Sequence, residues 1–86
     1  MSKEDIGVYI ESLIRPILSK PEDLFVDIMP DQLGVLYTVK IAQEDFGRVI
    51  GKQGNTINAI RTLARIVGLT HGIRPSIKIP DENRTN

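Results

Sequence analysis

Two glycines, Gly51 and Gly54, interrupt a stretch of the chain whose apolar residues otherwise recur at helical spacing. Glycine costs about 1 kcal/mol relative to alanine inside a helix, so this pair is not expected within one continuous helix. The pattern predicts two helices instead, over residues 43–50 and 55–67, with Lys52 at the tip of the short connection. Gly51 is expected to end the first helix, and Gly54 to let the second helix begin close by.

An amphipathic helix is predicted near the amino terminus. Ser2 followed by Asp5 has the pattern of a capping box at a helix start. Pro16 lies inside the apolar pattern and should distort or end the regular helix near Ile14, because proline has no N–H to donate. Residues 20–23 are expected to form a loop. The apolar positions that define this helix are Ile6, Tyr9, Ile10, Leu13, Ile14, Ile17 and Leu18.

Three strands are predicted from the rest of the chain. Residues 24–29 and 35–41 alternate between apolar and other side chains, and a hairpin loop between them makes them antiparallel neighbours. A short strand over residues 76–79 follows the last helix, for which Gly68 is the expected stop. The helical crossover before this strand suits a parallel connection. The predicted fold is α+β in two layers, with the element order helix-strand-strand-helix-helix-strand. A three-stranded mixed sheet carries three helices on one face.

The net charge of zero hides an uneven distribution. Residues 1–39 carry three basic and seven acidic side chains, a net charge of −4. Residues 40–80 carry seven basic and two acidic side chains, a net charge of +5, and residues 81–86 add −1. A polyanionic partner is therefore a question for residues 40–80 alone, where the alternative is a solvated basic face.

Length and composition indicate one globular domain. The 86 residues are 41% hydrophobic and 26% charged, which is typical of a folded chain. We expect a single domain over residues 1–80 and a frayed polar tail over residues 81–86. No apolar run has the length of a membrane span, residues 1–5 are charged rather than signal-like, and cysteine is absent. These features favour a cytoplasmic location without disulfides.

The glycine pair admits two interpretations. In one, the glycines serve the turn geometry alone, which leaves Lys52, Asn55 and Asn58 unexplained. In the other, the glycines let a phosphate approach the backbone at a helix N-terminus, where unpaired N–H groups favour anions, and Lys52 adds a cation. Nucleoside-triphosphate and dinucleotide loops are both excluded. The glycine spacing before Lys52 is wrong for the first, and Val49 stands where the second needs glycine.

The stretch VIGKQGNTINAI, residues 49–60, resembles the signature of the K-homology (KH) RNA-binding domain. Two apolar residues precede a G-x-x-G loop, and isoleucines follow at fixed helical spacing. The extra helix and strand at the amino terminus are similar to the type II arrangement of bacterial KH proteins. The resemblance covers essentially the whole chain. With RPILSKPED leading into the first strand, it extends to the small bacterial proteins that consist of a single KH domain.

This resemblance implies a site for single-stranded RNA. KH domains hold about four nucleotides, with the glycine loop against the backbone. By analogy the loop residues and Arg48 contact phosphates, and Asn55 lies behind them at the helix start. Ile50 and Ile57 line an apolar groove, and Asn58, Arg61 and the third strand flank the bases. The implied RNA-binding residues are Arg48, Ile50, Gly51, Lys52, Gln53, Gly54, Asn55, Ile57, Asn58 and Arg61.

No catalytic, metal-binding or cofactor-binding group of residues is predicted. His71 is the only histidine and is interpreted as a solvated loop residue. Glu44 and Asp45 are adjacent, so they do not face each other on a helix and are interpreted as favourable charges at a helix start. Phe46 is interpreted as a core residue. A non-catalytic binding module is therefore expected rather than an enzyme.

Ala59, Leu63 and Ile66 form a second apolar stripe on the last helix. The stripe is either the edge of a wide core face or a surface for a homodimer or another partner. The family resemblance implies an RNA chaperone or post-transcriptional regulator that acts with a larger KH-domain protein. It also implies a link to cell elongation, cell shape and peptidoglycan synthesis. The alternative is a protein–protein adaptor that keeps the KH scaffold but has negligible RNA affinity.

Overall fold

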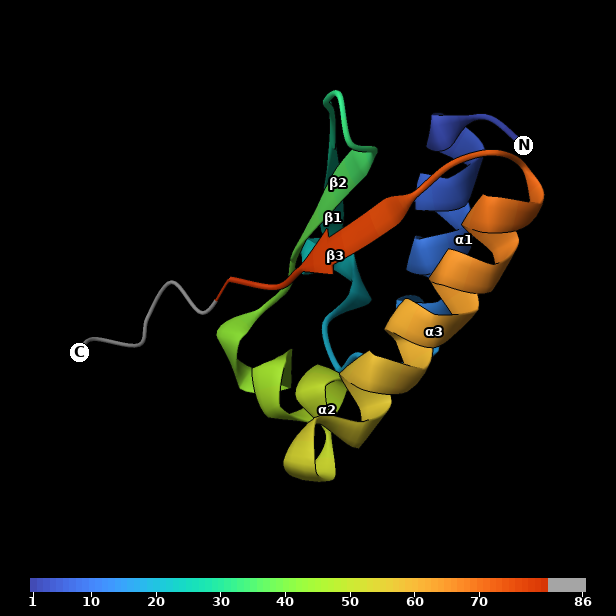
Figure 1. The fold of residues 1–86 in the computed structure, drawn as a ribbon. Coiled ribbons are helices and arrows are strands. Elements are labelled where there is room, and N and C mark those ends of the chain that lie inside the picture. Colours follow the sequence, from blue (N-terminus) through green and yellow to red (C-terminus); the bar gives the residue numbers. More distant parts are fainter. Residues whose placement is uncertain (81–86) are drawn as a thin grey trace.

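The computed structural model describes residues 1–80 and confirms the predicted α+β fold. The helices are α1 (Lys3–Ile14), α2 (Phe46–Ile50) and α3 (Asn55–Thr70), and the strands are β1 (Phe25–Pro30), β2 (Val35–Lys40) and β3 (Pro75–Lys78). Short 3₁₀ turns stand at Arg15–Ile17, Pro21–Asp23, Gln43–Asp45 and Lys52–Gly54. Helices α1 and α3 lie side by side next to the sheet, and α2 lies below them (Figure 1). The predicted tail, residues 81–86, lies outside the described residues.

The sheet has the order β1-β2-β3 and is mixed, as predicted. Strand β1 runs antiparallel to β2 with Phe25 opposite Lys40, and β2 runs parallel to β3 with Val35 opposite Pro75. The parallel pair requires a crossover, which α2 and α3 supply. This connection brings β3 back alongside α3 (Figure 1).

The core lies between the helices and one face of the sheet. Burial of each large aliphatic side chain there contributes about 1.5–3 kcal/mol to the free energy of folding. Tyr37, at the centre of β2, is completely buried, and its hydroxyl donates to the Lys3 carbonyl at 2.7 Å. Burial, with a smaller effect from Glu4, raises the pKa of Tyr37 to about 12. The buried core residues are Ile6, Ile10, Ile14, Leu18, Tyr37, Val39, Val49, Ile57, Ile60, Ala64 and Ile77.

The two ends of α1 follow the prediction. The Ser2 side chain accepts from the Asp5 N–H, and the Asp5 side chain accepts from the Ser2 N–H, so the capping box is complete. Beyond Ile14 the chain continues as a 3₁₀ turn that contains Pro16. The regular helix thus ends where the proline predicts.

The end of α3 differs from the prediction. Gly68 lies inside the helix, which continues to Thr70, and the left-handed residue beyond the end is Gly72, with φ +74°. The Ile73 N–H donates to the Gly68 carbonyl at 2.8 Å, as in a Schellman motif. A Cβ atom on Gly68 would lie 2.7 Å from Cδ of Pro75. Gly68 therefore allows close packing of α3 against the start of β3 rather than ending the helix.

Asp45 does more than favour a helix start. Its side chain is fully buried and accepts from the Ser19 N–H at 2.9 Å, the Ser19 hydroxyl at 2.7 Å and the Lys20 N–H at 3.0 Å. These hydrogen bonds, the Ser19 N–H foremost, lower the pKa of the Asp45 carboxyl. The carboxylate joins the segment after α1 to the start of α2. Phe46, interpreted from the sequence as a core residue, is only half-buried.

Candidate nucleic-acid interface

The loop between α2 and α3 has a backbone that glycine alone adopts readily. Gly51 has φ +77° and ψ 176°, and Gly54 is left-handed with φ +78° and ψ 11°. Gln53 between them is also left-handed, at φ 56°. A Cβ atom on Gly51 would lie 2.6 Å from Cβ of Thr56 and 2.9 Å from its backbone nitrogen. The first glycine is thus required by the turn itself.

The second glycine has a different environment. A Cβ atom on Gly54 would meet only Nδ2 of Asn58, at 3.6 Å, so packing within the described residues leaves this position open. Helix α3 begins immediately afterwards at Asn55, and no side chain caps its first turn. The Asn55 N–H donates to the Lys52 carbonyl, and the next N–H groups of that turn lie at the positive end of the helix, which favours an anion. Glycine here keeps the approach to these groups free of side-chain atoms.

Two cations lie beside this helix start. Lys52 is exposed at the loop tip, and its ammonium group makes no hydrogen bond or ion pair within residues 1–80. Arg48 on α2 is exposed, but its Nε lies 3.9 Å from Oδ1 of the buried Asp45. Lys52 is therefore the cation that is available to a ligand of the loop, whereas Arg48 already has a partner.

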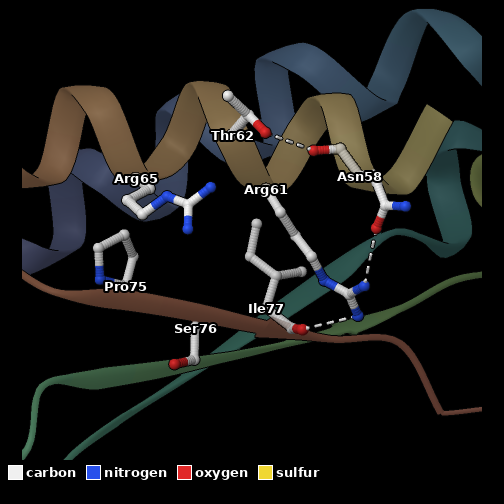
Figure 2. A pocket seen from close by; sticks show the side chains of 7 residues that line it. All are labelled: Asn58, Arg61, Thr62, Arg65, Pro75, Ser76 and Ile77. Atoms are coloured by element: carbon white, nitrogen blue, oxygen red, sulfur yellow. Dashed lines mark hydrogen bonds between the residues drawn. The ribbon is translucent and has the colours of Figure 1, made fainter. Parts of the chain in front are cut away.

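A groove of about 480 Å³ runs between α3 and β3 (Figure 2). Arg61 reaches across it, donating from Nη2 to the Ile77 carbonyl at 3.2 Å and from Nη1 to Oδ1 of Asn58 at 3.4 Å. The residues that line the groove are Asn58, Arg61, Thr62, Arg65, Pro75, Ser76 and Ile77. Amide, guanidinium and hydroxyl groups surround a small apolar floor, which is suitable chemistry for a planar polar ligand.

The structure brings most of the sequence-predicted residues to one side of the molecule, with two exceptions. The loop residues and Asn55 adjoin the start of α3, and Asn58 and Arg61 line the groove that continues from it. Ile57 is 3% exposed and belongs to the core, and the half-buried Ile50 packs against the same core. Neither isoleucine is among the residues that line this groove, so their part in RNA binding stays a prediction. Pro75 and Ile77 supply the apolar surface instead.

The sequence interpretation did not name three residues of the groove, Thr62, Arg65 and Pro75. The signal for the two on α3 is helical spacing. Thr62 and Arg65 lie four residues after Asn58 and Arg61, and residues four apart share a helix face. On β3, Ser76 and Ile77 belong to the third strand that was predicted to flank the bases, whereas Pro75 precedes the predicted bounds 76–79.

The predicted apolar stripe of α3 is exposed. Ala59 is exposed, and Leu63 and Ile66 keep 44% and 58% of their surface accessible. At about 100° per residue, Ile66 lies nearly opposite the core residue Ala64 on α3 and one turn beyond Thr62, at the edge of the groove. The stripe is therefore not the edge of the core.

Other site types find no support in the described part of the chain. Within residues 1–80, no three His, Asp or Glu side chains gather as a metal site requires. His71 is exposed, with Nδ1 3.3 Å from the Met1 amino group. Over the same residues, every helix is too short or too polar to cross a bilayer.

Comparison with known proteins identifies relatives. The model of the KhpA/KhpB KH domain matches residues 8–79, which include the loop and both walls of the groove. The chain is 31% identical to the RNA-binding protein KhpA of Chlamydia pneumoniae over 74 residues, 86% of this chain and 95% of the relative. Identity to the KhpA protein of Listeria monocytogenes is 41% over 59 residues, 69% and 78% of the two chains. Identity to that of Lactiplantibacillus plantarum is 33% over 82 residues, 95% and 96% of the two chains.

Proposed function

Because this chain belongs to the KhpA/KhpB KH-domain family, we propose that it is a non-catalytic protein that binds single-stranded RNA. Phosphates lie against the loop Gly51–Gly54 and the first turn of α3, and the bases enter the groove between α3 and β3. The domain responsible spans residues 1–80. The observation that carries the proposal is the open, uncapped start of α3 with the unpartnered Lys52 ammonium beside it.

The loop supports phosphate binding through two features that the turn alone does not need. A turn requires glycine at position 51, where Thr56 excludes a side chain, but it leaves space beside Gly54. A turn also has no use for an exposed cation at its tip, and the Lys52 ammonium has no partner among residues 1–80. Both features serve a phosphate that approaches the N–H groups of α3.

The groove supports single-stranded rather than duplex RNA. Its volume of about 480 Å³ accommodates a base that has left a stack, and its walls offer the Asn58 amide and the Ser76 hydroxyl for hydrogen bonds. A base in a duplex keeps its Watson–Crick edge paired and cannot enter a groove beside the loop. Aromatic stacking is not part of this site, since its lining residues include no aromatic side chain.

The test is fluorescence anisotropy with a labelled single-stranded octanucleotide and with a duplex of the same sequence. We expect modest affinity for the single strand and weaker binding of the duplex. The affinity for the single strand should fall as the salt concentration rises. Equal binding of both forms would contradict base entry into the groove. Absence of any RNA binding at low salt would leave the adaptor function, which the exposed face of α3 favours.

The cellular role follows from the family resemblance. We propose an RNA chaperone or post-transcriptional regulator in the cytoplasm that acts with a larger KH-domain partner of the KhpB type. The proposal includes a link to cell elongation, cell shape and cell wall biogenesis. Deletion of the gene should alter cell length, and normal growth and shape in the deletion strain would contradict this link.

We also propose that the chain forms a homodimer through the exposed stripe Ala59, Leu63 and Ile66. Apolar side chains gathered on one helix face are typical of an interface. Ile66 lies one turn beyond Thr62, so this face adjoins the edge of the groove. Leu63→Glu should shift a dimer to a monomer in sedimentation velocity, with a native circular dichroism spectrum. A wild type that stays monomeric at high concentration would exclude the homodimer.

A further inference from the structure

Two arginines one helical turn apart, Arg61 and Arg65, project from the same side of α3 toward β3 (Figure 2). Both are exposed and both line the groove, although the sequence interpretation named only Arg61. Their hydrogen bonds differ, and this difference assigns them different roles.

The guanidinium of Arg61 is already engaged. It donates to the Ile77 carbonyl on β3 and to the Asn58 side chain, so it connects the strand to a residue one turn earlier on the helix (Figure 2). To bind a phosphate, Arg61 would have to release a backbone carbonyl and leave the Asn58 amide without its partner. Its present bonds instead hold α3 at a fixed distance from β3 and orient the Asn58 amide.

The guanidinium of Arg65 has no partner within residues 1–80. The apolar ring of Pro75 and the Ser76 hydroxyl stand beside it in the groove, and neither neutralises its charge. Ten residues separate it from Asn55 at the loop end of α3, which corresponds to about 15 Å along the helix axis. One phosphate therefore cannot contact both the loop and Arg65, but one RNA strand that follows the groove reaches both.

We propose that Arg65 binds a second phosphate of the RNA at the end of the groove remote from the glycine loop, and that Arg61 is a positioning residue. The inference rests on the proposed RNA binding and adds a direction to it. The strand runs along α3 from the loop to Arg65. The planar guanidinium suits a phosphate because it offers parallel N–H donors, whereas a lysine offers a point charge.

The test compares matched substitutions on the two turns. Arg65→Met and Arg61→Met each remove one charge but keep an unbranched stem of similar reach. For a single-stranded octanucleotide, log affinity falls with log salt by about 0.7 for each phosphate contact. Arg65→Met should therefore reduce the steepness of this dependence by about 0.7, with an unchanged thermal melt. Arg65→Lys should retain the wild-type slope.

Arg61→Met should lower the affinity while it leaves the slope unchanged, because no phosphate contact is lost. Arg61→Lys should restore part of the affinity, since an ammonium still donates to the Ile77 carbonyl. Lys40→Met, which removes an exposed cation outside the groove, controls for general charge. An unchanged slope for Arg65→Met would overturn the assignment, and equal slope changes for both arginine variants would overturn the division of roles. If the wild type binds no RNA at all, the proposed function itself fails.

Discussion

At the scale of single residues, the buried carboxylate of Asp45 supports the site from a distance. It accepts three hydrogen bonds from Ser19 and Lys20 and stands at the start of α2, the helix that ends at Gly51. The charge of a carboxylate strengthens such hydrogen bonds. Loss of this anchor should loosen the attachment of α2, and with it the position of the loop.

We predict that Asp45→Asn destabilises the protein at neutral pH. The pKa of Asp45 is lowered in the folded state, so its carboxylate contributes stability above the unfolded pKa of about 3.9. This contribution disappears as the pH falls through the folded pKa. Urea denaturation should therefore show a lower free energy of unfolding for the variant than for the wild type at neutral pH, and this difference should close below pH ~4. The lowered pKa values of Glu4 and Asp5 affect both proteins alike. A difference that stays constant with pH would contradict this role.

At the scale of elements, the two loop glycines should differ in their response to alanine. Gly54→Ala introduces a side chain into open space, so its cost is that of a left-handed alanine, about 1–2 kcal/mol. Gly51→Ala adds a collision with Thr56, including its backbone nitrogen, and should cost more than Gly54→Ala. Urea denaturation of both variants measures the order, with Gly54→Asn as a control because asparagine tolerates this conformation. A larger loss of stability for Gly54→Ala than for Gly51→Ala would contradict the close contact between position 51 and Thr56.

At the scale of the whole molecule, the sequence predicts the fold well because each element carries a local signal. The capping box at Ser2, the proline after Ile14 and the alternation in both hairpin strands depend on near neighbours in the chain. The errors arose where distant segments meet. Asp45 is buried because Ser19 packs over it, and Gly68 is small because Pro75 returns beside it. Spacing within one segment does not show such contacts.

In the candidate site, too, local signals were predicted better than contacts between distant segments. The loop from Gly51 to Gly54 was found because its glycines break a local pattern. The groove was predicted in part. Asn58, Arg61 and the third strand were expected beside the bases, but which residues of β3 line the groove depends on its pairing with β2. The sequence could not place Ile57, because one apolar period suits a core and a groove wall equally well; in the structure its side chain is 3% exposed.

The central claim is that the glycine loop binds RNA phosphates, and the most direct measurement compares wild type with the double variant Lys52→Asp/Gln53→Asp. Both side chains are exposed, so no core is lost, and aspartate tolerates the left-handed conformation of Gln53. Fluorescence anisotropy with a single-stranded octanucleotide is measured at two salt concentrations, alongside thermal melts. If two or three phosphates contact the protein, log affinity of the wild type should fall with log salt concentration at a slope of about −1.4 to −2.1. The account predicts that the folded variant loses binding, and undiminished binding by a folded variant would contradict it.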